Sequence, residues 1–178
     1  MSNSVGTIYL IDDEADILDV EKELLETHNY KVKAFLHYKE LLKAIEDEKP
    51  HLILSDMKMP EIDGLVLFNE IRKTHASIPV VFVSGFLTKD VVIKAMQAGA
   101  FSVLEKPFRH EAVLDVCKQA VSRSTALRAF DKIIPEMKNI SQKLKIEKDE
   151  SKRTKELESL NENLNKVSEA CLSLNASR

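Results

Sequence analysis

The sequence predicts an α/β fold, in which a five-stranded, doubly wound parallel sheet is followed by an extended helical tail. Short apolar runs typical of strands alternate with segments of helical periodicity through about the first 120 residues of the 178-residue chain. All four glycines and four of the five prolines lie before residue 110, so the last part of the chain need not turn. Such alternation predicts helices on both faces of the sheet, joined by right-handed crossovers.

Each predicted strand is a run of apolar residues, several of them β-branched or aromatic, as is typical of buried strands. In chain order, the five runs occupy residues 7–13, 30–35, 52–56, 79–84 and 102–106. Four of the runs end in polar residues, and only the second run does not.

Each predicted helix is a segment in which apolar residues recur at intervals of three or four. In chain order, the five segments run from Ile17 to Leu25, Leu41 to Ile45, Leu65 to Ile71, Val91 to Met96 and Val113 to Val121. Pro50 follows the second segment and Gly99 the fourth, as expected of residues that end helices.

Polar side chains follow four of the predicted strands. Ligands of parallel sheets bind beyond the carboxyl ends of the strands, so these residues are candidates for one site. The first strand ends on Asp12 and Asp13, the third on Asp56, the fourth on Ser84 and the fifth on Lys106. We therefore expect three carboxylates, a hydroxyl and an amine to meet at one edge of the sheet.

This set of groups is suited to phosphoryl transfer. Three neighbouring carboxylates repel one another, and Mg²⁺ relieves the repulsion because it favours carboxylate, water and phosphate oxygens. One carboxylate can attack phosphorus as a nucleophile, while the metal, the ammonium and the hydroxyl neutralise the phosphoryl oxygens. Each residue alone is weak evidence, since an aspartate after a strand is often a helix cap, but the combination favours a phosphoryl site.

Other classes of site are not supported. The chain has no Gly-x-Ser-x-Gly elbow and no phosphate-binding Gly-x-x-x-x-Gly-Lys loop. Its five histidines lack the spacing of metal ligands. Cys117 and Cys171 lie far apart in helical patterns, which predicts neither a disulfide framework nor a zinc site.

The composition predicts a cytoplasmic protein that neither enters membranes nor binds nucleic acid. No apolar run approaches the roughly 18 residues of a membrane span, and the N-terminus lacks the features of a signal peptide. The net charge of −3 gives no electrostatic reason to expect nucleic acid as a partner.

Five short motifs combine these residues with their neighbours. They are Ile11-Asp12-Asp13, residues 55–60 together with Asp63-Gly64, Val83-Ser84-Gly85, Ala98-Gly99-Ala100 and Lys106-Pro107-Phe108. Together they resemble the motifs of response-regulator receiver domains of two-component signal transduction, over roughly residues 5–123. The resemblance implies a receiver domain at residues 1–123 with the flavodoxin-like strand order 2-1-3-4-5.

The resemblance also implies roles for the acidic residues. Asp56 would accept the phosphoryl group. Asp12, Asp13 and Asp56, together with the backbone carbonyl of Lys58, would hold Mg²⁺.

Ser84 would bond to one phosphoryl oxygen and Lys106 to another, and the Lys106–Pro107 peptide bond would be cis. One position departs from the family pattern, because Val103 stands where the family usually has an aromatic residue that moves inward on activation. Phe101 lies two residues earlier and would point to the same face in a regular strand.

A receiver domain implies a signalling switch that catalyses its own phosphoryl transfer and autodephosphorylation, with a sensor histidine kinase or phosphotransfer protein as partner. In one hypothesis, phosphorylation changes the surface from the fourth to the fifth helix and a helical tail transmits the change to a dimer or partner. In the alternative hypothesis, the protein is a phosphorelay intermediate that passes the group between histidine domains. A third option is that the tail is the connecting helix of a larger regulator.

Residues 124–178 are predicted to form a helical extension with a coiled-coil pattern. Apolar residues recur at heptad spacing at Leu157, Leu160, Leu164, Val167, Cys171 and Leu174. The same spacing occurs at Leu127, Phe130, Ile134 and Met137, and charged residues interrupt it in between. A homodimeric coiled coil is favoured over a helix folded back on the receiver or a hairpin within one chain. No DNA-binding motif is apparent, since the segment lacks the turn of a helix-turn-helix.

Overall fold

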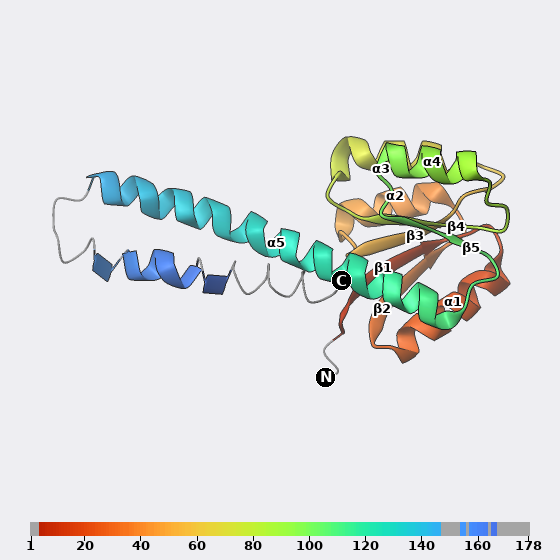
Figure 1. Ribbon diagram of the computed structural model, residues 1–178, viewed down its shortest axis with the longest axis horizontal. Helices are drawn as coiled ribbons and strands as arrows, with labels where there is room; N and C mark the ends of the chain where they lie inside the picture. Colours follow the sequence, from red (N-terminus) through yellow and green to blue (C-terminus); the bar gives the residue numbers. More distant parts are fainter. Residues whose placement is uncertain (1–3, 147–153, 156, 164, 167–178) are drawn as a thin grey trace. The chain divides into compact units, whose positions relative to one another are not determined.

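The structure is a computed structural model that describes residues 4–146, 154–155, 157–163 and 165–166. The chain divides into two units, Met1–Ser124 and Thr125–Arg178. Strands and helices alternate through the first unit (Figure 1). The strands are β1 (Gly6–Ile11), β2 (Tyr30–Phe35), β3 (Leu52–Asp56), β4 (Val80–Ser84) and β5 (Ser102–Glu105). The helices are α1 (Ala15–Thr27), α2 (Tyr38–Asp47), α3 (Gly64–His75), α4 (Lys89–Ala98) and α5 (His110–Ile146).

The five strands form one parallel sheet in the order β2-β1-β3-β4-β5. This confirms the predicted five-stranded, doubly wound sheet and its order. The order reverses between β1 and β3, and ligands of such sheets bind beyond the strand ends at this switch point. Ile8 pairs with Leu52 and Ile53 pairs with Val80, so the strands that carry the predicted acidic residues are direct neighbours.

Two hydrophobic clusters lie on the two faces of the sheet. On one face, α2, α3 and α4 cover a cluster that includes Tyr9, Phe68 and Phe82. On the other face, α1 and the part of α5 in the first unit cover a cluster that includes Leu10 and Val113. Every residue of β1 is buried, which explains why its sequence is a continuous apolar run instead of an alternating one.

Side chains and a glycine define the ends of the helices that follow β3 and β4. The Asp63 carboxylate accepts a hydrogen bond from the Leu65 N–H at the start of α3, at 2.9 Å. The Thr88 hydroxyl accepts one from the Val91 N–H at the start of α4, at 3.3 Å. Both are N-caps of the expected kind. Gly99 ends α4 in the left-handed region at a φ of 96°, as its place in the sequence predicted.

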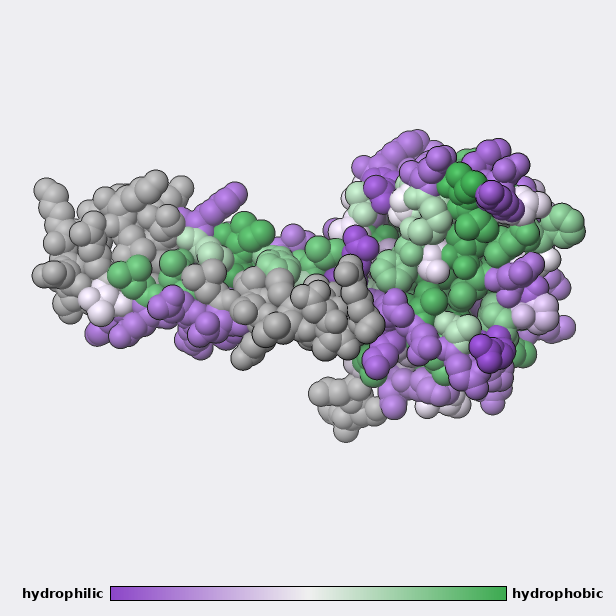
Figure 2. Space-filling view, in the orientation of Figure 1, coloured by the Kyte–Doolittle hydropathy of each residue, from purple (hydrophilic) through white to green (hydrophobic). Residues whose placement is uncertain are grey.

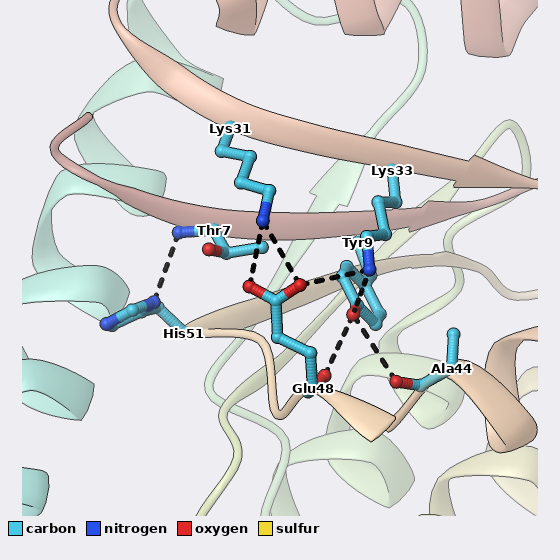
Figure 3. Close-up of polar contacts among 7 residues, drawn as sticks. All are labelled: Thr7, Tyr9, Lys31, Lys33, Ala44, Glu48 and His51. Atoms are coloured by element: carbon cyan, nitrogen blue, oxygen red, sulfur yellow. Dashed lines mark hydrogen bonds and ion pairs between the residues drawn. The ribbon is translucent and has the colours of Figure 1, made fainter. Parts of the chain in front are cut away.

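A polar network fixes the connection from α2 to β3 against the edge of the sheet (Figure 3). The Glu48 carboxylate pairs with Lys31 and Lys33 of edge strand β2, each at 3.0 Å. The hydroxyl of the buried Tyr9 donates to the Glu48 carbonyl at 2.8 Å. These contacts join β1, β2 and the residues before β3, and they lie toward the amino ends of the strands, opposite to the edge where the strands end.

The second unit continues α5 as far as Ile146, with Pro135 inside the helix. Residues 154–155, 157–163 and 165–166 are also helical. Four residues of the predicted heptad pattern, Leu164, Val167, Cys171 and Leu174, lie outside the described residues, so the coiled coil stays a prediction. None of the helices in the described part of the chain has the length and hydropathy needed to cross a membrane.

Candidate functional site

The carboxyl ends of β1, β3 and β5 bring Asp12, Asp56 and Lys106 together. Asp12 follows β1, Asp56 ends β3 and Lys106 follows β5. The Lys106 ammonium donates to Asp12 Oδ2 and, at 3.1 Å, to Asp56 Oδ1. The three residues, here called the acidic cluster, thus form one hydrogen-bonded group from parts of the chain far apart in sequence.

The acidic cluster is largely shielded from water. The Asp12 side chain is 4% exposed, that of Asp56 is 11% exposed and that of Lys106 is 18% exposed. Burial raises the pKa of Asp56, and the hydrogen bonds from the Lys58 N–H and from Lys106 oppose this rise. Burial acts to lower the pKa of Lys106, but its bonds to Asp12 and Asp56 outweigh this effect and the pKa is raised. Lys106 is therefore a fixed positive charge at neutral pH.

Backbone contacts set the position of the two carboxylates. Asp12 accepts a hydrogen bond from the Glu14 N–H at 2.9 Å, so β1 ends at Ile11 and the strand is shorter than predicted. Asp56 accepts a hydrogen bond from the Lys58 N–H. The Lys58 side chain turns away and pairs with Asp63 at 3.0 Å.

Gly64 lets the chain after Asp56 fold tightly against the site. A Cβ on Gly64 would lie 2.6 Å from the Asp56 carbonyl oxygen and 3.0 Å from the Met57 Cα. The Gly64 N–H donates to the Met57 carbonyl at 2.9 Å. Because both neighbours are backbone atoms, only a residue without a side chain permits this approach.

The side chains of two predicted site residues form no hydrogen bond or ion pair with the acidic cluster among the described residues, although the Lys106 N–H donates to the Ser84 carbonyl at 2.8 Å. Asp13 is exposed and lines a small pocket beside the loop that follows β3. Ser84 is 2% exposed, and its hydroxyl exchanges hydrogen bonds with the backbone of Phe86, at 3.2 and 3.3 Å. A Cβ on Gly85 would meet no atom within 4 Å, so the space beside this loop is open.

The donor set of the acidic cluster is compatible with Mg²⁺. No three Asp, Glu, His or Cys side chains among the described residues are close enough to ligate one ion. Mg²⁺ needs only one or two carboxylates, since carbonyl oxygens and waters complete its octahedron. Asp12 and Asp56 supply two such oxygens, and the backbone of Lys58 lies against Asp56.

Three further features around the site match or differ from the sequence predictions. The Lys106–Pro107 bond is cis, as expected. Val103 packs on the α2–α3–α4 side of the sheet, whereas Phe101 packs with Leu104 on the α1–α5 side. The expectation that Phe101 and Val103 share a face was wrong, because Phe101 precedes the first residue of β5 and does not follow its alternation.

Glu21 of α1 is a site residue that the sequence reasoning missed. It is 9% exposed, and its charge interacts with Lys106, Asp12 and Asp56. Burial raises the pKa of Glu21 to about 7. The charge of Glu21 also adds to the burial that raises the pKa of Cys117 to about 12, so this thiol stays protonated.

A signal for Glu21 was present in the sequence. It lies three residues after Leu18 and four before Leu25, and all three are buried. The apolar residues on which the predicted segment from Ile17 to Leu25 rested include Val20, which is 62% exposed. An acidic residue in register with buried leucines on a helix is the pattern that marks such a position.

The first unit is similar in sequence to known response-regulator proteins. The profile of the response regulator receiver domain matches residues 8–118. The chain is 32% identical over 117 residues to the DNA-binding transcriptional regulator NtrC of Proteus hauseri, covering 66% of this chain and 25% of NtrC. It is 27% identical over 138 residues to the response regulator protein TodT of Pseudomonas putida, covering 78% of this chain and 61% of TodT. The chain therefore spans about a quarter of the length of the NtrC regulators it matches.

Two solved structures are also similar to this chain. A response regulator receiver domain protein from Clostridium thermocellum is similar with a TM-score of 0.64 and 31% identity, over 68% of this chain and 98% of that one. NtrX from Brucella abortus in complex with ATP is similar with a TM-score of 0.65 and 26% identity, over 76% of this chain and 34% of that one.

Proposed function

The chain belongs to the family of response regulator receiver domains, and from this premise we propose that Asp56 accepts a phosphoryl group from a sensor histidine kinase or phosphotransfer protein in the cytoplasm. The observation that carries the proposal is the acidic cluster, in which Lys106 joins Asp12 and Asp56. Receiver domains are signalling switches that accept phosphoryl groups from histidine kinases.

The transfer step needs a nucleophile and a neutralising positive charge. An oxygen of Asp56 forms a bond to phosphorus as the bond from phosphorus to the donor histidine nitrogen breaks, and that nitrogen leaves with the electron pair. The Lys106 ammonium, already bonded to Asp56, stays beside the phosphoryl oxygens and offsets their charge. Mg²⁺, held by Asp12, Asp13, Asp56 and the Lys58 carbonyl, would add further positive charge when bound.

Ser84 is the proposed link between the acceptor and the surface. Its hydroxyl bonds to the backbone of Phe86 in the loop that leads to α4. When the hydroxyl turns to a phosphoryl oxygen, these two bonds are lost and the loop is released. The aromatic residue that usually accompanies this movement is replaced by Val103, so the loop and α4 carry the change in this chain.

The proposed output is the face over α4 and β5, acting with the helical tail. Figure 2 shows hydrophobic residues gathered on this face of the first unit. Ile93 and Met96 of α4 are 41% and 48% exposed, which is large for apolar side chains and is typical of an interaction surface. Residues 124–178 then transmit the switch to a homodimer or to a partner protein.

The test of the acceptor is phosphorylation by acetyl phosphate with Mg²⁺, followed by mass spectrometry of the intact protein. We expect the mass of one phosphoryl group to be added to the wild type and to the Asp63→Asn control. We expect none on Asp56→Asn, and phosphorylation of that variant at the same rate would overturn the assignment. Ready transfer of the phosphoryl group from Asp56 of the wild type back to the histidine of a phosphotransfer domain would support the phosphorelay alternative over the interaction switch.

A further inference from the structure

Glu21 lies on the buried side of α1, beside the acidic cluster. Glu21 and Lys106 line the same pocket, which has a volume of about 550 Å³. Glu21 is 9% exposed, and its neighbours on the same helix, Leu18 and Leu25, are also buried. A carboxylate in such a position is shielded from water, so its charge acts on its surroundings more strongly than a surface charge does.

No cation in the described part of the chain forms an ion pair with Glu21. The charge of Glu21 interacts with that of Lys106 and with those of the two aspartates of the acidic cluster. The Lys106 ammonium, however, donates to Asp12 and Asp56. On α5, Cys117 stays a protonated thiol and supplies no positive charge. Two carboxylates of the acidic cluster thus share one ammonium, and ionised Glu21 adds a further negative charge.

The charge of Glu21 has opposite effects on the two groups that the site is proposed to bind. Mg²⁺ is attracted by negative charge in its surroundings. A phosphoryl group brings additional negative charge, so a buried carboxylate beside the site repels it. A substitution that merely loosened the site would weaken the binding of both groups. Opposite changes in the two affinities therefore distinguish the charge of Glu21 from its role in packing.

We propose that Glu21 is a positioning residue, whose charge strengthens the binding of Mg²⁺ at the acidic cluster and weakens the hold of the site on a phosphoryl group at Asp56. Glu21 acts through the charges of the acidic cluster, and it is proposed neither as a metal ligand nor as the acceptor. The inference rests on the proposed function of Asp56. The phosphorylated state would be less stable than in the same site without this carboxylate.

The test measures both affinities by NMR on the full chain at about pH 8, where Glu21 is ionised because its pKa is about 7. The amide signal of Lys58, whose N–H donates to Asp56, follows the addition of Mg²⁺ alone. It then follows the addition of beryllofluoride, which imitates the phosphoryl group, at a concentration of Mg²⁺ that saturates each protein.

Removal of the charge should shift the two affinities in opposite directions. In Glu21→Gln, we expect the affinity for Mg²⁺ to fall at least about fivefold. We expect the affinity for beryllofluoride to rise about twofold, because its single charge interacts with Glu21 about half as strongly as the divalent ion does. Glu21→Leu, which places an apolar side chain beside Leu18 and Leu25, should shift both affinities in the same directions.

The matched control is Glu23→Gln, which removes an exposed carboxylate of the same helix and should change neither affinity, because water and salt screen its charge. The proposal is overturned if wild type and Glu21→Gln bind Mg²⁺ equally, if both affinities fall together, or if Glu23→Gln has the same effect as Glu21→Gln. These results would leave the proposed function intact, because Asp56 is unchanged in every variant. Failure of the wild type to bind Mg²⁺ would overturn both the metal site and the role of Glu21.

Discussion

The substitution Glu21→Gln should make the protein more stable, and the gain should depend on pH. Glu21 is 9% exposed and lacks a hydrogen-bond partner in the described part of the chain. Glutamine keeps the size of the side chain and removes the buried charge. The acid form of Glu21 is also neutral, so the two proteins should have similar stability where Glu21 is protonated in both the folded and the unfolded states.

The size of the effect follows from the raised pKa. Burial raises the pKa of Glu21 from 4.5 to about 7 in the folded protein, a difference of roughly 2.5 units at about 1.4 kcal/mol per unit. Because the folded pKa is above the unfolded one, the folded state binds more protons between these values. The contribution of Glu21 to the free energy of unfolding is therefore most favourable at low pH, and it falls as pH rises from about 4.5 to about 7. Ionised Glu21 should cost about 3 kcal/mol at pH 8 and less than about 1 kcal/mol at pH 5.

Urea denaturation of the wild type and of Glu21→Gln at the two pH values measures this difference. The matched control is Glu23→Gln, since Glu23 is exposed on the same helix and its loss should change stability by less than about 0.5 kcal/mol at either pH. If Glu21→Gln is no more stable than the wild type at pH 8, or if its gain is the same at pH 5, Glu21 does not carry a buried charge and the reasoning is refuted.

Two further substitutions test how the site is built. Gly64→Ala places a Cβ 2.6 Å from the Asp56 carbonyl oxygen, so it should destabilise the protein by about 1–3 kcal/mol in urea denaturation, and an unchanged midpoint would contradict the close approach. Lys106→Met leaves Asp12 and Asp56 without their shared cation. It should lower stability by about 2 kcal/mol in urea denaturation, whereas an unchanged midpoint would contradict the role of Lys106 in holding the two carboxylates together.

The strand ends could be predicted because the polar residues there directly follow apolar runs. Asp56 and Lys106 each end such a run, and a parallel sheet brings the carboxyl ends of its strands to one edge. The hydrogen bonds from Lys106 to Asp12 and Asp56 therefore follow from local patterns and topology together. The end of β1 at Ile11 could not be predicted in this way, because the hydrogen bond from the Glu14 N–H to Asp12 does not affect the hydropathy pattern of the sequence.

Side-chain direction was less predictable than position. Ser84 lies where the sequence places it, but its hydroxyl bonds to Phe86, and only local backbone geometry decides this. Phe101 packs on the opposite face from Val103 because strand alternation does not extend to the residue before β5. Glu21 was overlooked because charged residues are normally assigned to the solvent face of a helix.

The account predicts that modification of Asp56 changes how the protein assembles, and light scattering tests this most directly. The molar mass of the full chain is measured with Mg²⁺, with and without beryllofluoride, which imitates the phosphoryl group on Asp56. We predict a change between monomer and dimer in the wild type, and no change in Asp56→Asn. A mass that stays constant in the wild type, or that changes equally in Asp56→Asn, would contradict the account.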